Sequence, residues 1–426
     1  MNPVYIVSAV RTPIGKFGGA LADLTAADMG VIAVRAAIER AFGEIPPGRT
    51  PVDKPSWDGI PPFSREAPAA ARKTPYRVDE VIIGNARPAG IGPNLARQIA
   101  WRAGLGDDVP AFTINMACAS GMRAILLGWQ QILLGEADII VAGGAESMTQ
   151  VPYLLDARWG FKMGHQTLMD SMYRDGLFCR IARMIMGETA EVLARQYKIT
   201  REEQDAYALE SQQRAARAMQ EGRFGAELIP VEHTNAKGKT IRVEADEHVR
   251  MGTTLESLAK LPPVFSKTGS ITAGNASGIT DGAAAVVLMS EKKMRELQIM
   301  PLARIVDATV AAVDPRIMGI GPVPAVEKMV KRTGRKLDAY DAIELNEAFA
   351  AQVLACDREL HIDRAKLNPN GGAIALGHPI GCTGARIVST LVHGLRGTAS
   401  HNPGKRGLAT LCVSGGLGIA LAIETC

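Results

Sequence analysis

A cysteine among small residues, at the start of an apolar helical pattern, is the first side chain in the sequence that could do covalent chemistry. Cys118 stands in NMACASGMRAI, residues 115–125, and apolar residues then follow at roughly helical spacing. The first turn of a helix stabilises a thiolate through its unpaired N–H groups and its dipole. The stretch therefore favours a nucleophilic thiol, although a cysteine that only fills space in a core fits the same pattern.

Three further segments carry side chains that could serve such a nucleophile. Asn346 and Glu347 follow the strand-like YDAIEL, where a buried polar pair is costly unless it is used or hydrogen-bonded. His378 stands in the glycine-rich NPNGGAIALGHPIGCTGAR, and Cys412 ends the strand-like TLC before VSGGLG. A lone histidine is more often a satisfied core residue than a base. A thiol, a histidine and a second thiol in glycine-rich turns form a much more specific combination.

Composition limits the class of protein. The chain has 426 residues, of which 47% are hydrophobic, a length typical of two or three domains. The sequence shows neither a long apolar run nor a secretory leader, so we expect no membrane span and a cytoplasmic location. The six cysteines form no C-x-x-C pair and no His-rich cluster, which predicts free thiols and no metal site. The net charge of +4 is spread over both signs, which disfavours a nucleic-acid partner.

The elements that must position these residues follow an internal repeat. Strand-like runs such as VYIVSAV, EVIIGNA and DIIVAGGAE alternate with helical segments, which predicts α/β layering. The second half repeats this order: ARIVDATV matches VYIVSAV, YDAIELNEA matches VDEVIIGNA, and TLCVSGG matches DIIVAGG. The segments around Cys118 and His378 occupy corresponding places. A pseudo-two-fold arrangement would therefore bring Cys118, Asn346, His378 and Cys412 together.

Two regions fall outside the repeat. Residues 44–77 are rich in proline and predict a long surface insertion with no catalytic role. Residues 149–280 hold Met-rich and charged segments, and a helix beginning at TREEQDAY with Thr200 and Glu203 as a capping box. We expect three units: a first half at 1–148 completed by 281–300, an inserted subdomain at 149–280, and a second half at 301–426.

Taken together, these motifs resemble the thiolase family of acetyl-CoA acyltransferases. NMACASG is similar to the family's nucleophile motif, and NEAF, GGAIALGHPIGCTGAR and CVSGG are similar to its other active-site motifs; TAGNASGITDGAA, residues 272–284, is similar to a further signature. The resemblance covers nearly the whole chain except about 44–77. It implies two duplicated βαβαβαββ halves in a five-layer αβαβα sandwich with an inserted loop domain.

The resemblance also implies reversible Claisen chemistry on thioesters. Cys118 would form the acyl-enzyme, His378 would take its proton, and Cys412 would move the α-proton of the second acyl-CoA. One oxyanion hole would be His378 with a water held by Asn346, and the other would be the backbone N–H groups of Cys118 and Ser414. Glu347, which is next to Asn346, would orient the neighbouring groups.

A coenzyme A site follows from the same resemblance. Arg250 and Ser257 would meet the nucleotide, Phe265 and Met186 would cover the pantetheine, and Ser277 would accept its amide. Ile185 stands where many short-chain members carry histidine, so the acyl pocket would tolerate longer chains. Coenzyme A and acyl-CoA would be substrates, with no permanently bound cofactor.

Several alternatives remain within and beyond this family. The favoured activity is acetyl-CoA C-acetyltransferase (acetoacetyl-CoA thiolase), and the alternative is a degradative 3-ketoacyl-CoA thiolase of fatty-acid β-oxidation, with or without a partner subunit. A non-catalytic lipid carrier would have lost the nucleophile, the histidine or the second cysteine. A decarboxylating condensing enzyme has no reason to keep both Cys412 and NEAF. We expect a homotetramer, or else a dimer, with the Met-rich stretch 163–172 joining the subunits.

Overall fold

The computed structural model describes residues 3–50, 74–235, 237–397 and 402–426. Its main feature is one ten-stranded sheet in the order β14-β15-β16-β13-β1-β12-β5-β3-β4, with β2 paired to β12. The two halves of this sheet meet where β1 pairs with β13, at only Tyr5–Arg304 and Ile6–Ala303. The sheet is therefore two units, one of six strands with β1 and β12 and one of four strands with β13 and β16, joined by a short seam.

The first unit is built from residues on both sides of the inserted segment 149–280. Its strands are β1 (Val4–Arg11), β2 (Gly15–Lys16), β3 (Glu80–Gly84), β4 (Ala111–Ile114), β5 (Ile139–Ser147) and β12 (Thr280–Ser290). Its helices are α1 (Ala26–Phe42), α2 (Leu95–Arg102), the 3₁₀ turn η1 (Ala117–Ala119), α3 (Ser120–Leu134) and α7 (Glu291–Glu296). Strand β12 lies between β1 and β5, so the first unit closes only with residues that follow the inserted segment.

The second unit repeats the first. Its strands are β13 (Ala303–Ala312), β14 (Ala342–Leu345), β15 (Arg406–Val413) and β16 (Leu417–Thr425). Its helices are η3 (Pro315–Ile320), α8 (Pro322–Thr333), η4 (Leu337–Ala339), α9 (Ala350–Leu360), α10 (Ala373–Leu376) and α11 (Ile380–Arg396). The register of β1 shifts between Ile6 and Ser8, and that of β13 between Ile305 and Asp307, which are equivalent places in the predicted repeat.

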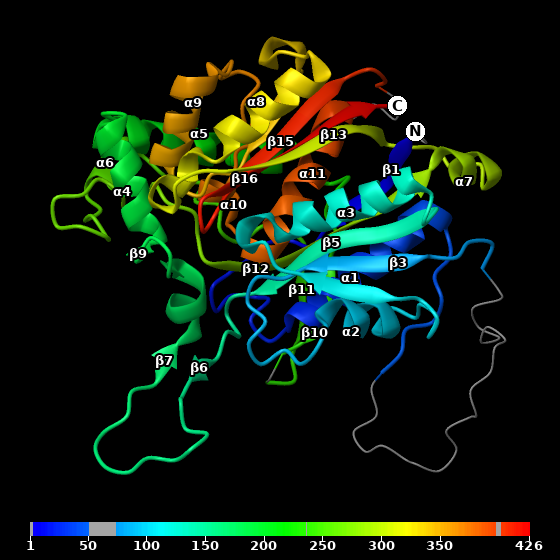
Figure 1. The fold of residues 1–426 in the computed structure, drawn as a ribbon, viewed down its shortest axis with the longest axis horizontal. Coiled ribbons are helices and arrows are strands. Elements are labelled where there is room, and N and C mark those ends of the chain that lie inside the picture. The colour runs from blue at the N-terminus through cyan, green and yellow to red at the C-terminus, as the bar shows by residue number, and fades with distance from the viewer. Residues whose placement is uncertain (1–2, 51–73, 236, 398–401) are drawn as a thin grey trace.

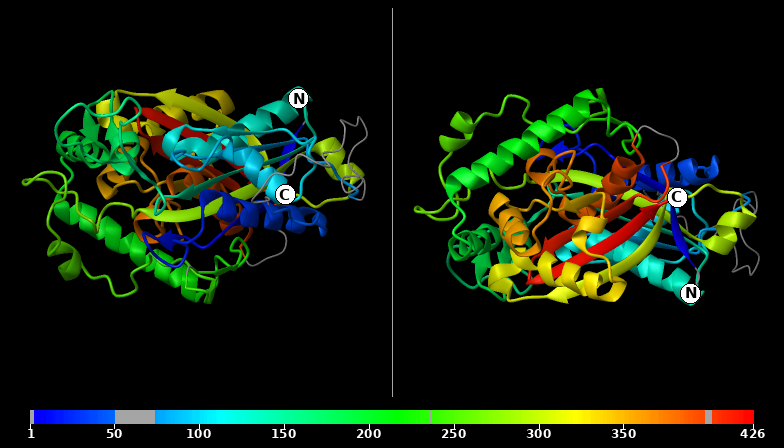
Figure 2. Two further views of the ribbon diagram at one scale, coloured as in Figure 1. Left: turned by 90° about the horizontal axis from the view of Figure 1, so that it is seen from below. Right: turned by 90° about the horizontal axis from the view of Figure 1, so that it is seen from above.

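The inserted segment interrupts the first unit in sequence, between β5 and β12. It contains β6 (Tyr153–Leu154), β7 (Met169–Asp170), the π-helical turn η2 (Tyr173–Leu177), β8 (Phe178–Cys179), β9 (Met184–Ile185), α4 (Met186–Gln196), α5 (Arg201–Gln220), β10 (Val231–Thr234), β11 (Thr240–Val243) and α6 (Leu255–Ala259). The predicted capping box of α5 is confirmed, because Thr200 and Glu203 exchange side-chain and backbone hydrogen bonds. Figure 2 shows α5, the long green helix, on the outside of the layers.

The layers follow the predicted five-layer order. In Figure 1, α8 and α9 cover the second unit of the sheet, α3 and α11 lie between the two units, and α1 and α2 cover the first. Separate apolar clusters fill the outer interfaces, and a larger one surrounds α3 and α11. No helix in the described ranges is both long and apolar enough to cross a membrane.

Glycines let α3 and α11 approach each other and the sheet at backbone distance. A Cβ on Gly121 would lie 2.8 Å from the Ala385 nitrogen, and one on Gly384 would lie 2.4 Å from the Met122 nitrogen. A Cβ on Gly144 of β5 would lie 2.0 Å from the Gly381 carbonyl oxygen. Only glycine fits at such contacts. The starts of the two central helices, which carry the predicted nucleophile and histidine, are thereby held against each other.

The predicted insertion lies partly outside the described residues, since 51–73 are not placed. On either side of that gap, Phe42 and Tyr76 stack with ring centroids 3.7 Å apart, and the Tyr76 hydroxyl donates to the Glu44 carbonyl at 2.8 Å. The described ends of the insertion therefore lie side by side, next to the end of α1.

Candidate active site

A strained turn presents Cys118 between β4 and α3. Ala117 adopts φ +44°, a left-handed conformation that costs a non-glycine residue about 1 kcal/mol. The Ser120 hydroxyl secures the turn, because it accepts from the Met116 N–H at 2.9 Å and donates to the Ala117 carbonyl at 2.7 Å. Cys118 is partly exposed and packs with Ile380, two residues beyond His378.

The electrostatics of Cys118 differ from the sequence-based expectation of a thiolate stabilised at a helix start. Burial raises the pKa of the Cys118 thiol, and this effect exceeds the lowering by the Ser414 backbone N–H and the Arg87 charge. The resting side chain is therefore a thiol that needs a base. The Ser414 N–H nevertheless points at the sulfur, where an oxyanion donor of a thioester adduct would have to lie.

His378 supplies a candidate base. It lies between α10 and α11, and its backbone N–H donates to the Gly278 carbonyl at 3.1 Å. Its Nδ1 lies 2.6 Å from the Thr383 hydroxyl, whereas its Nε2 has no partner among the described residues. Burial, and then the charges of Arg386 and Arg87, lower the pKa of His378 to about 3. The ring is thus neutral near pH 7 and able to accept a proton.

Cys412 lies near the end of β15 and is fully buried. Burial raises the pKa of this thiol well above its usual value, and the neighbouring Cys118 sulfur raises it further. Strand β15 contacts the η1 turn that carries Cys118, so the two cysteines come from neighbouring elements. Met186 and Phe349 share the apolar cluster of Cys412, so the second thiol is shielded from water.

Asn346 and Glu347 follow β14 but have different surroundings. The Asn346 backbone N–H donates to the Thr410 carbonyl of β15 at 3.0 Å, yet neither polar atom of its buried side-chain amide has a partner in the part of the chain that the structure describes. An unpaired buried amide costs free energy, which favours a role in holding a water or ligand. Glu347 instead accepts from Tyr207, Ser211, Asn368 and Ile374 at 2.6–3.1 Å.

A pocket of about 680 Å³ leads to His378. Four of the predicted coenzyme A residues line it, namely Arg250, Phe265, Met186 and Ser277. Ser257 is outside this lining, and its hydroxyl caps α6 by donating to the Thr254 carbonyl at 2.7 Å. Ile185 lines the same pocket and gives it an apolar wall, as predicted.

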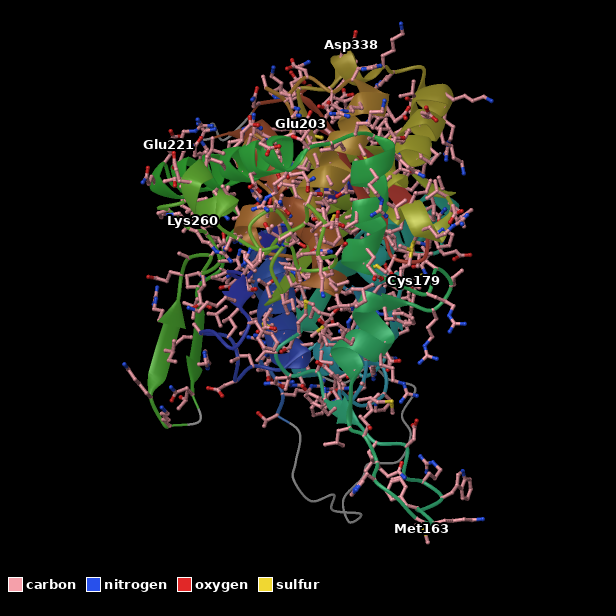
Figure 3. The ribbon with its side chains drawn as sticks, turned by 90° about the vertical axis from the view of Figure 1, so that its left-hand side faces the viewer. Met163, Cys179, Glu203, Glu221, Lys260 and Asp338 are labelled. Atoms are coloured by element: carbon pink, nitrogen blue, oxygen red, sulfur yellow. The ribbon has the colours of Figure 1, made fainter. Side chains whose placement is uncertain are left out.

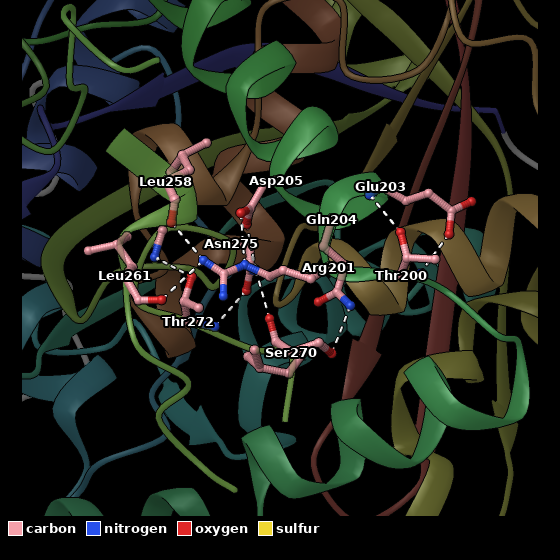
Figure 4. Close-up of polar contacts among 12 residues, drawn as sticks. Thr200, Arg201, Glu203, Gln204, Asp205, Leu258, Leu261, Ser270, Thr272 and Asn275 are labelled. Atoms are coloured by element: carbon pink, nitrogen blue, oxygen red, sulfur yellow. Dashed lines mark hydrogen bonds and ion pairs between the residues drawn. The ribbon is translucent and has the colours of Figure 1, made fainter. Parts of the chain in front are cut away.

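Helix α5 anchors the inserted segment beside this pocket. Arg201 donates to the carbonyls of Leu258 and Leu261, and Asp205 accepts from Asn275 at 2.9 Å (Figure 4). Gln204 donates to the Ser270 hydroxyl at 2.9 Å. These bonds hold the 270–275 loop, which leads directly into the pocket-lining residues 276–279.

Sequence reasoning missed three residues of the site. Thr383 contacts His378, and its place in the turn after that histidine is a signal that could have indicated it. His248 lines the pocket, with its Nδ1 2.9 Å from the Ala375 carbonyl, but its sequence context has no motif. Arg87 is buried, and its charge lowers the pKa of both Cys118 and His378; no local sequence motif indicates this role.

Comparison with known proteins decides the family. The sequence matches the thiolase N-terminal domain over residues 4–50 and 65–292, and the thiolase C-terminal domain over residues 299–425. The chain belongs to the thiolase family. This thiolase is an acyltransferase, and its family match extends into both ends of the insertion predicted at 44–77, so that within those residues 51–64 are unmatched.

Named relatives resemble this thiolase over their full length. It is 47% identical to a probable acetyl-CoA acyltransferase of Staphylococcus aureus, covering 100% of this chain and 99% of that one. It is 45% identical to an acetyl-CoA acetyltransferase of Cupriavidus necator, with 100% of both chains covered.

Solved structures share the fold. The Bacillus anthracis acetyl-CoA acetyltransferase superposes with a TM-score of 0.89 at 43% identity, covering 100% of this chain and 99% of that one. A human mitochondrial 3-ketoacyl-CoA thiolase in complex with CoA superposes with a TM-score of 0.86 at 42% identity, and the match covers 100% of this chain and 98% of that one. The five-layer thiolase fold predicted from the motifs is confirmed.

Proposed function

We propose that this thiolase joins two acetyl-CoA molecules into acetoacetyl-CoA and free coenzyme A, and catalyses the reverse cleavage. The observation that carries this proposal is the position of His378: it lines the 680 Å³ pocket, its Nε2 has no partner among the described residues, and the helix that follows it contacts the η1 turn of Cys118. Coenzyme A and acyl-CoA are then substrates. No group of three or more His, Cys, Asp or Glu side chains in the described ranges is arranged to hold a metal ion.

In the first half-reaction, the Cys118 sulfur attacks the thioester carbonyl while His378 Nε2 takes the thiol proton. The negative charge on the carbonyl oxygen is stabilised by the backbone N–H groups of Cys118 and Ser414. Collapse breaks the C–S bond to coenzyme A, which leaves with the proton held by His378. The acetyl group then remains on Cys118.

In the second half-reaction, the Cys412 thiol passes its proton to His378 Nε2, and the resulting thiolate removes the α-proton of a second acetyl-CoA. The enolate oxygen accepts hydrogen bonds from a water on Asn346 and from protonated His378 Nε2. The enolate carbon attacks the acetyl carbonyl, and the tetrahedral adduct collapses with release of the Cys118 sulfur, which takes the proton from His378 Nε2. Glu347 acts at a distance, by holding Asn368 and the α10 backbone in place.

The coenzyme would lie along the pocket walls. Arg250 is exposed and cationic, which suits the phosphates, whereas Phe265 and Met186 offer an apolar cover for the pantetheine. The Ser277 side chain faces the pocket, and we assign it the pantetheine amide. Ser257, which lies on α6, remains in this proposal as an outer contact of the nucleotide.

A second candidate is the cleavage of longer 3-ketoacyl-CoA substrates in fatty-acid degradation, with or without a β-oxidation partner subunit. The apolar Ile185 wall favours it, because a longer acyl chain gains free energy from apolar contact. A chain-length series of 3-ketoacyl-CoA substrates, assayed for coenzyme A-dependent cleavage, separates the two activities. Highest kcat/KM with acetoacetyl-CoA supports the first, and a rise with chain length supports the second.

The covalent step has its own test. After incubation with acetyl-CoA and acid quenching, mass spectrometry of a digest should find the acetyl group on Cys118. The Cys118→Ala variant should carry none and should keep its fold, because the change is small. A label confined to Cys412, or no label, contradicts the mechanism.

We also propose a homotetramer in the cytoplasm, divided into the units 1–148 with 281–300, 149–280 and 301–426. Figure 3 shows the β6–β7 hairpin extending far from the body, with Met163 at its tip. Trp159 and Met163 are 94% and 93% exposed, which is unusual for such apolar side chains in a monomer. Strand β4 is a sheet edge with partly exposed residues, so it offers a second surface to another copy.

A further inference from the structure

Among the described residues, the ring of His378 has a hydrogen-bond partner at one of its two nitrogens. Its Nδ1 lies 2.6 Å from the Thr383 hydroxyl, and its Nε2 has no partner among the described residues. Both side chains are buried. A neutral imidazole carries one ring proton, so the surroundings decide which nitrogen holds it.

The Thr383 hydroxyl has a second contact, to the Pro379 carbonyl oxygen at 3.0 Å. Donation from threonine to the carbonyl four residues earlier is a common arrangement in helices. This carbonyl also receives the backbone N–H groups of Cys382 and Thr383 at 2.9 Å, so it is a shared acceptor. The hydroxyl can therefore give its single proton either to Pro379 or to His378.

The two possible positions of the ring proton, Nδ1 and Nε2, differ in the number of hydrogen bonds that they allow. With the proton on Nδ1, the ring donates to the Thr383 oxygen while the hydroxyl donates to Pro379, and each polar hydrogen has an acceptor. With the proton on Nε2, the hydroxyl donates to Nδ1, and the buried Nε2–H is left without a protein acceptor. Unpaired buried N–H groups are the rarer and more costly case.

We propose that Thr383 is a positioning residue that holds neutral His378 with its proton on Nδ1, so that the Nε2 lone pair faces the pocket. The inference rests on the proposed function only for its kinetic part. The same oxygen remains an acceptor after Nε2 takes the Cys118 proton, because the Nδ1–H bond is unchanged. A single arrangement thus serves the histidine first as a base and then as an oxyanion donor.

A spectroscopic measurement tests the placement of the proton directly. The enzyme is labelled with ¹⁵N-histidine, and the Nδ1 and Nε2 resonances of His378 are assigned among the seven histidines by their loss in His378→Asn. Nε2 should show the chemical shift of an unprotonated nitrogen in the wild type and in Thr383→Ser. Thr383→Val keeps the shape but removes the acceptor, so the proton should redistribute toward Nε2.

Kinetics then link the proton to the reaction. The rate of Cys118 acetylation should fall on the order of tenfold in Thr383→Val, mainly in kcat, and stay within about twofold in Thr383→Ser. Thr309→Val is the matched control, because Thr309 is also buried and donates to a backbone carbonyl, that of Ala325 at 2.6 Å. Its acetylation rate should equal that of the wild type.

The charged groups that act on the ring are Arg386 and Arg87. All three variants keep these groups. A wild-type His378 protonated on Nε2, or a Thr383→Val enzyme with wild-type shifts and rates, overturns the inference. Failure of acetyl label to appear on wild-type Cys118 would instead refute the proposed function and leave the spectroscopic result standing.

Discussion

The two thiols of the site differ in how they can lose a proton. Cys118 is partly exposed, receives the Ser414 N–H and lies within the field of Arg87, whereas Cys412 is fully buried among apolar side chains. Burial disfavours a thiolate in both cases; at Cys118 the Ser414 N–H and the Arg87 charge oppose this effect, whereas at Cys412 its own backbone N–H does. The nucleophile is therefore the thiol that can react with a reagent from solvent, and Cys412 must act inside a closed site.

This difference predicts how alkylation of Cys118 depends on pH. Because its pKa is raised above 9.0, the thiol form prevails below that pH, and the rate with iodoacetamide should still be rising as the pH passes 9. Peptide mass spectrometry over a pH series gives the rate for Cys118 alone. A plateau reached below pH 8 would show that the thiolate is stabilised in the free enzyme.

For Cys412 the prediction concerns the second half-reaction. Cys412→Ser should still accept an acetyl group on Cys118, because the acylation step uses His378. It should lose exchange of the acetyl-CoA α-protons with deuterated water, along with condensation, because a hydroxyl is a far weaker acid than a thiol. Exchange at the wild-type rate would assign the α-proton to a different group.

At the scale of elements, Glu347 joins segments distant in sequence. Its carboxylate accepts from Tyr207 and Ser211 of α5, from Asn368, and from the Ile374 N–H of α10. The inserted segment is thereby tied to the loop that precedes His378. This explains why an acidic residue stands next to Asn346 without lining the pocket.

Glu347→Gln should destabilise the protein by about 2–3 kcal/mol, because the new NH₂ group faces buried donors and leaves at least one unpaired. Glu359→Gln is the control, since Glu359 is exposed and also accepts from a tyrosine, Tyr197, at 2.6 Å. Its effect should be below about 0.5 kcal/mol. Denaturant unfolding measures both, and equal effects would contradict the structural role.

The contact of β5 with the start of α11 gives a second prediction. Gly144→Ala places a Cβ 2.0 Å from the Gly381 carbonyl, so the start of α11 must move away from Cys118, and activity should fall at least tenfold. Gly394→Ala on the same helix meets only Asn370, at 3.7 Å, and should keep full activity. Steady-state assays and circular dichroism together show whether geometry or folding is lost.

The sequence identified the residues of the site better than it predicted their contacts with one another. The repeat and the glycine-rich motifs located Cys118, His378 and Cys412 because they are local patterns. The contact of Thr383 with His378, and the charge of Arg87 beside Cys118, depend on packing between helix starts and could not be derived from letters alone. The direction of the Cys118 pKa shift was misjudged for a related reason, since helix position is visible in sequence but burial is not.

For the whole molecule, the exposed β6–β7 hairpin is the feature that most needs a partner. Replacing Trp159 and Met163 together by serine should convert a tetramer to dimers, because these side chains would lose apolar contacts between copies. Met300→Ser is the control, because Met300 is exposed too, at 74%, but lies near α7. This substitution should leave the assembly unchanged. Light scattering distinguishes the species, and an unaltered tetramer would move the interface elsewhere.

The position of β12 has a consequence for the order of events during synthesis. The strand fills the place between β1 and β5, yet it leaves the ribosome only after the whole of residues 148–279. At about 5–20 residues per second, the earlier strands wait on the order of ten seconds with unpaired edges. The nascent first unit is then an open sheet, in which the facing edges of β1 and β5 stay unpaired until residue 290 has emerged.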